Sequence, residues 1–240
     1  MVSAMIDEGM TIAVLCSFLL DWFAVGFEWR KIKPIAKVLA MVMVILWTLS
    51  AVGWVTDFFI ILLLLGQLLG LTGDIFLLFP DRWFFAGLGA FLIGHLIYAA
   101  LIFYDIASSD NFDLSLPSTL FPITISLIFW CVVLLFAYHI FKRDYFLQHA
   151  KGELLWNLVQ VYTWILSGLF ALILFRTLIQ SDLTVQFFLL PIGGGLFLLS
   201  DILLGYNRFV NPIPKGQLWV HMTYHLAKFS LAAGFLAFLA

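Results

Sequence analysis

Seven ionisable side chains lie inside long apolar stretches of this sequence. Such groups are costly in lipid, so they face a partner or a cavity, and they commonly relay protons, bind ions or act as acid and base. They are therefore the first candidates for a functional site. The seven residues are Asp21, Asp74, His95, Asp201, His221, His225 and Lys228.

Two of these residues, Asp74 and Asp201, occur late in apolar stretches and in similar contexts, TGDIFLL at 72–78 and LSDILL at 199–204. Two carboxylates that share a low-dielectric cavity can divide the roles of acid and base between them. We predict that both are catalytic and leave open which one donates the proton. The alternative is two unrelated aspartates at the membrane edge, each in contact with loop lysines.

A second group follows the spacing of one helix face, because His221, His225 and Lys228 are separated by four and three residues. The two histidines could bind a metal together with an aspartate or His95, and Lys228 could form a Schiff base. The commoner arrangement is a polar face along a cavity, with Lys228 as the counter-charge to an aspartate or a lipid phosphate. We therefore predict no metal ligand and no cofactor. For Asp21 we expect no functional role, because its carboxylate can reach the membrane interface.

The elements that carry these residues are predicted from composition. The chain is 64% hydrophobic and 11% charged, whereas soluble domains are roughly 45–50% apolar and 25% charged. A spanning helix needs about 20 mostly apolar residues, and eight stretches qualify. The prediction is an all-α membrane bundle, a single domain over residues 1–240 with eight transmembrane helices, at 10–27, 35–53, 58–79, 83–104, 116–141, 155–179, 184–204 and 217–239.

The basic residues predict the orientation, because cytoplasmic connections are enriched in Lys and Arg. On one side only Arg176 occurs, so that side, with both termini, is predicted to be non-cytoplasmic. The short tails and the lack of a sorting signal favour a bacterial inner membrane over the endoplasmic reticulum. The connections after the odd-numbered helices hold Arg30, Lys31, Lys33, Lys37, Arg82, Lys142, Arg143, Lys151, Arg208 and Lys215.

The similar contexts of the two aspartates also suggest two parallel four-helix halves, at about 1–105 and 116–240. The helices at 58–79 and 184–204 both run towards the cytoplasm in this topology. We therefore expect Asp74 and Asp201 to reach the same depth and to share a polar cavity that opens to the cytoplasm.

Two longer strings carry a resemblance to a known family. GLTGDIFLLFPDRWFFAGLGAFLIGHLIYAA at 70–100 and LLSDILLGYNRFVNPIPKGQLWVHMTYHLAK at 198–228 resemble the two signature regions of the YhhN-like lysoplasmalogenases. The resemblance implies hydrolysis of the vinyl ether bond of lysoplasmalogens, which yields a fatty aldehyde and glycerophospho-ethanolamine or -choline. By the same resemblance the essential aspartates of the family fall on Asp74 and Asp201.

The resemblance also implies accessory positions around the substrate, at His95, Tyr98, Asn207, Arg208 and Tyr224, and Tyr162 lies where the family pattern points to another. Lys215 joins Asn207 and Arg208 as an expected ligand of the phosphate headgroup, since Arg offers paired donors and Lys a point charge. Where the family pattern has a tyrosine and a neutral amide, this sequence has His225 and Lys228, which we also place beside the substrate.

The expected partner is a lysophospholipid that enters from the surrounding membrane lipid. We predict no nucleic-acid partner and leave the oligomeric state open. The alternatives are a transporter or lipid-binding protein in which Asp74, Asp201 and His95 form a relay, and a metal-dependent lipid hydrolase that uses the histidines.

Overall fold

The computed structural model describes residues 8–53, 57–79, 83–107, 117–141, 152–179 and 185–236, and every element in these ranges that extends over more than a turn is an α-helix. The predicted fold class is thus confirmed for the part of the chain that is described. Its eight helices lie on the eight predicted stretches, and α8 continues past residue 204. The helices are α1 (Glu8–Gly26), α2 (Lys33–Val52), α3 (Phe58–Phe76), α4 (Phe84–Ala107), α5 (Pro117–Ile140), α7 (Gly152–Leu178), α8 (Val185–Phe209) and α9 (Gly216–Leu236).

Seven of these helices are long and apolar enough to cross a membrane. Their outer surface is apolar as well: on α5, for example, Leu135 is 69% exposed and Phe121 is 65% exposed. Large apolar side chains exposed in such numbers are unfavourable in water and are expected where lipid covers the helix. The chain is therefore a multi-pass membrane protein.

The eighth helix, α9, is the exception to this apolar pattern. It has 21 residues, which at 1.5 Å per residue gives about 31 Å, close to the thickness of the hydrocarbon core. It contacts α1, α2 and α8, so protein covers much of its polar face. α9 is not one of the seven apolar helices because it carries several polar side chains, so an eighth membrane crossing remains a prediction. These side chains are Gln217, His221, Thr223, His225 and Lys228.

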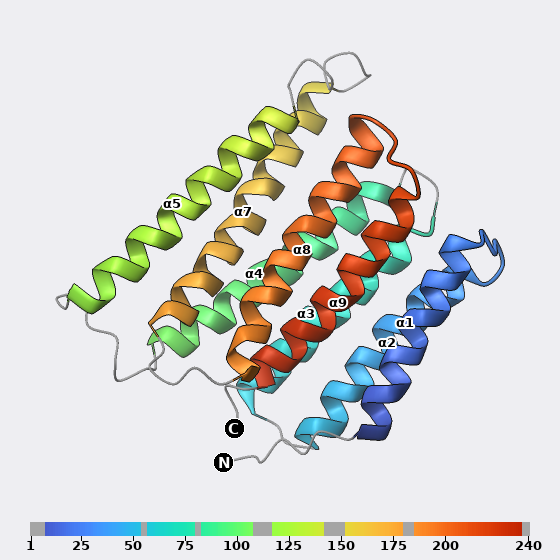
Figure 1. Ribbon diagram of the computed structural model, residues 1–240, viewed down its shortest axis with the longest axis horizontal. Helices are drawn as coiled ribbons and strands as arrows, with labels where there is room; N and C mark the ends of the chain where they lie inside the picture. The colour runs from blue at the N-terminus through green and yellow to red at the C-terminus, as the bar shows by residue number, and fades with distance from the viewer. Residues whose placement is uncertain are drawn as a thin grey trace.

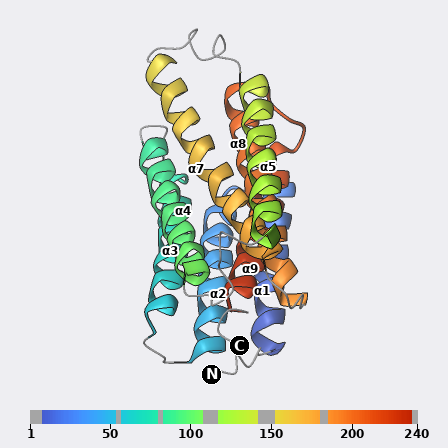
Figure 2. The same ribbon diagram turned by 90° about the vertical axis from the view of Figure 1, so that its left-hand side faces the viewer.

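Six helices form a closed, flattened ring in the order α2, α3, α4, α7, α8 and α9, with α9 back in contact with α2. Outside the ring, α1 packs on α2 and α9, and α5 packs on α7 (Figures 1 and 2). The same chain of contacts recurs in α1 to α4 and in α5 to α9, as two four-helix halves would give. The division into halves stays a prediction.

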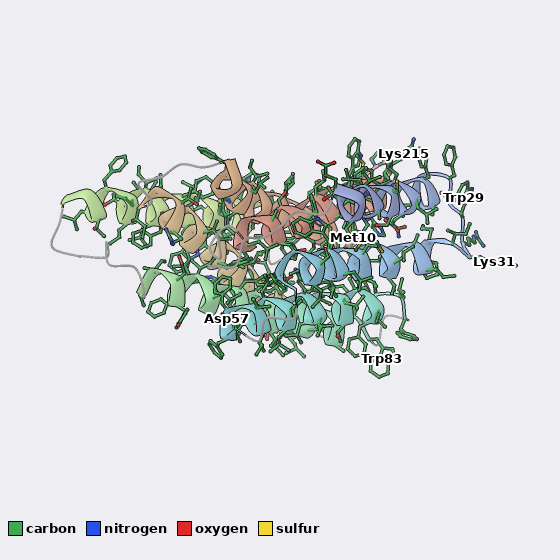
Figure 3. All side chains as sticks on the ribbon, turned by 90° about the horizontal axis from the view of Figure 1, so that it is seen from below. Met10, Trp29, Lys31, Asp57, Trp83 and Lys215 are labelled. Carbon is green, nitrogen blue, oxygen red and sulfur yellow. The ribbon has the colours of Figure 1, made fainter. Side chains whose placement is uncertain are left out.

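The two ends of the bundle differ in charge. α1 begins and α9 ends at one end (Figure 1), and α3 begins there after Asp57, whose side chain accepts a hydrogen bond from the Phe59 amide at 2.7 Å. The other end, which we call the basic end, carries Arg30, Lys31, Lys33, Arg208 and Lys215. Figure 3 shows Trp29, Lys31 and Lys215 at this end, away from Asp57. The predicted cytoplasmic side is the basic end, and the orientation remains a prediction.

Small residues let neighbouring helices approach closely. α8 runs through the three consecutive glycines at 193–195 without interruption. A Cβ at Gly193 would lie 2.7 Å from the backbone nitrogen of Leu231 on α9. Likewise, a Cβ at Gly94 on α4 would lie 3.3 Å from the carbonyl oxygen of Gly66 on α3. The glycines therefore set the helix spacing around the site and do not break the helix.

Candidate active site

A polar cavity of about 550 Å³ lies at the basic end, between α2, α3, α4, α8 and α9. Asp74 from α3 and Asp201 from α8 both line it, so the expectation that the two aspartates share one cavity is confirmed. Both helices run towards the basic end. Asp74 lies in the last turn of α3, and Asp201 lies in the second half of α8.

Asp74 is held by two donors from other helices. Its Oδ1 lies 3.0 Å from Nζ of Lys37 on α2, and its Oδ2 accepts a hydrogen bond from the Tyr224 hydroxyl on α9 at 2.7 Å. The side chain is 1% exposed. Asp74 therefore has a cation on one oxygen and a hydroxyl donor on the other. Lys37 was counted only as a topological charge in the sequence, and its role in the site was missed.

Asp201 has a different environment. Its Oδ2 accepts a hydrogen bond from the Tyr162 hydroxyl on α7 at 2.5 Å, and within the described ranges it forms no ion pair. It also lines an apolar groove between α4, α5, α7 and α8, together with side chains such as Phe141 and Leu166. Asp201 therefore lies at the boundary between the polar cavity and the apolar groove.

The mouth of the cavity is cationic. Arg30, Lys33, Lys37 and Arg208 line it, against the two carboxylates. Lys33 donates a hydrogen bond to Oε1 of Gln217 at 2.9 Å, and the Arg208 guanidinium lies 4.0 Å from the centre of the Phe84 ring. Such a lining attracts an anion. Of these residues only Arg208 was predicted, although the spacing of Lys33 and Lys37 on one helix face was a usable signal.

A third acidic group reaches this region from α1. Asp21 is fully buried, and its Oδ2 lies 2.7 Å from Nδ1 of His221 and 3.8 Å from Nδ1 of His225. The expectation that Asp21 reaches the membrane interface was wrong, because α1 packs against α9 and presents the carboxylate to the two histidines. His221 also lines the cavity, whereas His225 is stacked on Phe18, with ring centres 4.9 Å apart.

A family model matches residues 32–235 of this chain, and its description is the YhhN family. The chain belongs to the YhhN family. No curated protein and no solved structure matches it. The matched range holds both aspartates, both tyrosines and Lys37, while α1 with Asp21 lies before it.

Several predicted site residues of this YhhN protein lie behind the cavity lining. The Lys228 ammonium is buried over aromatic rings, 4.6 Å from the centre of Phe197, 5.4 Å from Tyr98 and 5.5 Å from Tyr224. Lys228 was expected as the counter-charge to an aspartate or a lipid phosphate; it interacts electrostatically with Asp74 and Asp201, but the close ion pair with Asp74 is made by Lys37. His95 is buried edge-on to the Tyr162 ring, and its two ring nitrogens form no hydrogen bond to described residues.

Two of the three predicted headgroup ligands of this YhhN protein line the cavity, and the third does not. Asn207 and Arg208 line the cavity, in the last turn of α8. Oδ1 of Asn207 also accepts a hydrogen bond from the Ile213 amide at 2.8 Å, which holds the connection to α9. Lys215 is not among the cavity-lining residues. It lies directly before α9 with a φ of 54°, and its carbonyl accepts a hydrogen bond from the amide of Leu218.

The histidines and acidic residues of this YhhN protein were also considered as metal ligands. Among the residues that the structure describes, no three His, Cys, Asp or Glu side chains are grouped as a metal site would need. The polar groups of the cavity are instead paired with one another, aspartate with tyrosine, lysine or histidine. The arrangement suits acid–base chemistry by side chains.

Proposed function

We propose that this YhhN protein is a membrane lysoplasmalogenase, which hydrolyses the vinyl ether bond of a lysoplasmalogen to a fatty aldehyde and glycerophospho-ethanolamine or -choline. The observation that carries the proposal is the placement of Asp74 and Asp201 on one cavity, each bound by a tyrosine hydroxyl from another helix. Membership of the YhhN family and the resemblance of the two signature regions support the same reaction.

The surroundings of the aspartates suit a single-chain phospholipid. Its phosphate would bind at the cationic mouth, where Arg30, Lys33 and Arg208 offer charged donors. Its hydrocarbon chain would lie in the apolar groove, which shares Leu77, Phe84 and Asp201 with the cavity. The vinyl ether joins the chain to the glycerol, so this pose brings it to the boundary at which Asp201 lies.

The two carboxylates differ in a way that favours separate roles. Asp74 is paired with a cation, Lys37, whereas Asp201 has only a tyrosine hydroxyl as its donor and faces the apolar groove. We assign proton donation to Asp201 and electrostatic stabilisation to Asp74. A fixed negative charge beside a developing cation is a large source of rate acceleration, and a positioned acid typically contributes about 10²–10⁴-fold.

The proposed hydrolysis has three steps: protonation of the double bond, addition of water and collapse of a hemiacetal. Asp201 donates a proton to the double-bond carbon that is farther from the oxygen, and the other carbon becomes part of an oxocarbenium ion beside Asp74. Water adds to that carbon and loses a proton, which gives a hemiacetal. The hemiacetal breaks its bond to the glycerol oxygen, with one proton moved to that oxygen and one removed from the hydroxyl. One water is consumed, and the aldehyde and the glycerophospho-alcohol leave.

The direct test is release of aldehyde from lysoplasmenylethanolamine by purified protein. We expect aldehyde from the wild type and a loss of about 10²-fold or more for Asp74→Asn and Asp201→Asn. The acyl analogue lysophosphatidylethanolamine, which lacks the vinyl ether, should release no product. Asp57→Asn is the matched control, because Asp57 is exposed at the other end of the bundle and Asn caps a helix about as well as Asp does. We expect this variant to stay active.

No aldehyde from the wild type, or unchanged rates in both aspartate variants, would refute the proposal. Uptake of an intact lysophospholipid into proteoliposomes without any product would favour the transporter or lipid-binding alternative. Loss of activity with a chelator and its return with added metal would favour a metal-dependent hydrolase.

A further inference from the structure

The cavity carries a third acid–base group besides the two aspartates. His221 on α9 lines the cavity, and its Nδ1 lies 2.7 Å from Oδ2 of Asp21. Asp21 belongs to α1, which packs beside α9 at the edge of the ring (Figure 1). A carboxylate can only accept a hydrogen bond, so Nδ1 of His221 carries the shared proton and Nε2 is left as an acceptor.

This geometry is that of a histidine held in one tautomer by a buried carboxylate. A carboxylate in that position orients the imidazole and stabilises the imidazolium that forms when Nε2 takes a proton. In the described part of the chain no hydrogen bond is formed by Nε2 of His221. The orienting residue, Asp21, is fully buried, while the histidine side chain is 16% exposed.

The other members of the site are less suited to accept a proton from water. Both oxygens of Asp74 are occupied, Oδ1 by Lys37 and Oδ2 by Tyr224. His225 is near Asp21 too, but it is fully buried and does not line the cavity. His221 lies three residues before Tyr224 on α9, so it is on the same helix face as the group that binds Asp74.

We infer that His221, oriented by Asp21, is the base that takes a proton from the attacking water. The inference rests on the proposed function and extends it. In the addition step, Nε2 of His221 receives one proton from water while the water oxygen bonds to the oxocarbenium carbon. In the collapse, the imidazolium returns this proton to the glycerol oxygen, and the Asp201 carboxylate takes the hemiacetal hydroxyl proton. Both groups then regain their starting protonation.

The test uses the purified full chain and lysoplasmenylethanolamine in D₂O. In the wild type the oxocarbenium is captured quickly, so recovered substrate should carry no deuterium on its vinyl carbon. In His221→Ala we expect kcat to fall by about 10²-fold or more. Because capture is slow, the oxocarbenium that has received a deuteron from Asp201 can give its original vinyl hydrogen back to Asp201, and recovered substrate should gain deuterium. Added imidazole should restore part of kcat and suppress the label.

Two further variants keep the test independent of folding. Asp21→Asn keeps the shape of the side chain and should cause a smaller loss of kcat than His221→Ala, with deuterium again in the recovered substrate. His139→Ala removes an exposed imidazole on α5 and should leave kcat and the label unchanged. A structural role for the cluster could lower activity, but it would produce neither the label nor the rescue by imidazole.

The inference is overturned if His221→Ala keeps the wild-type kcat. It is equally overturned if kcat falls in His221→Ala without deuterium in the substrate and without rescue by imidazole. Absence of aldehyde from the wild type is a different result, because it refutes the proposed function itself.

Discussion

Lys37 is the residue whose removal tests the electrostatics of the site most directly. Lys37→Met keeps the length and the apolar stem of the side chain and removes the charge 3.0 Å from Asp74. Asp74 is 1% exposed and keeps only the Tyr224 hydroxyl as donor. Breaking a buried ion pair from one side costs about 3–5 kcal/mol, because the remaining charge stays buried and unpaired.

We expect a value near the lower end, about 3 kcal/mol, because the cavity gives Asp74 some access to water. For a chain of this size that loss lowers Tm by roughly 6–12 °C. The measurement is thermal unfolding of the purified protein in detergent. Lys33→Met is the matched control, since Lys33 lies one helical turn away at the surface and donates to a neutral amide; it should cost less than about 1 kcal/mol.

The double variant Lys37→Met with Asp74→Asn separates charge from packing. Neutralising Asp74 removes the unpaired charge, so the double variant should be more stable than Lys37→Met alone. The reasoning fails if Lys37→Met and Lys33→Met unfold at the same temperature, or if the double variant is no more stable than Lys37→Met.

Two further predictions concern the tyrosines and the helix packing. Tyr162→Phe should lower kcat more than Tyr224→Phe, because Asp74 keeps its lysine when Tyr224 is lost. A hydrogen bond to a charged group is worth about 1.5–3 kcal/mol. The rate of aldehyde release measures both losses, and equal losses would contradict the prediction. Gly193→Ala should lower Tm, because its Cβ would lie 2.7 Å from the backbone of Leu231. In the control Gly89→Ala the new Cβ meets nothing within 4 Å, and the variant should be more stable by about 0.5–1 kcal/mol. The prediction is wrong if both variants unfold at the same temperature.

The positions of the helices could be predicted from the sequence because they depend on local properties. Each is a run of about 20 apolar residues bounded by proline or charge, and α2, for example, begins at Lys33 with Pro34 in its first turn. The meeting of Asp74 and Asp201 followed from topology, since helices of the same direction bring similar positions to the same depth.

The partners of the aspartates could not be predicted in the same way. Hydropathy does not determine which helices are neighbours, so Lys37 on α2 and Tyr224 on α9 were not connected with Asp74 in advance. Lys228 was expected as a counter-charge because of its position on a polar helix face. Its long side chain instead reaches from α9 across to α3, so that the ammonium lies over aromatic rings and a Cβ at Gly70 would lie 2.7 Å from Nζ.

Asp21 shows a different kind of error. Its place near the end of an apolar stretch suggested that the side chain could reach the interface, and the general cost of a charge in lipid was given too little weight. Only the contact between α1 and α9, the first and last described helices, explains its burial.

Because α9 closes the ring, the site is assembled late in the folding of the chain. Tyr224 follows Asp74 by 150 residues and His221 follows Asp21 by 200 residues, so each aspartate is synthesised long before its partner. α9 is also the helix whose polar residues make insertion into lipid alone least favourable. We expect the helices already in place to assist its docking, because they offer it the glycine surface of α8 and the carboxylates of Asp74 and Asp21. The site is therefore complete only after α9 has docked against helices that were synthesised earlier.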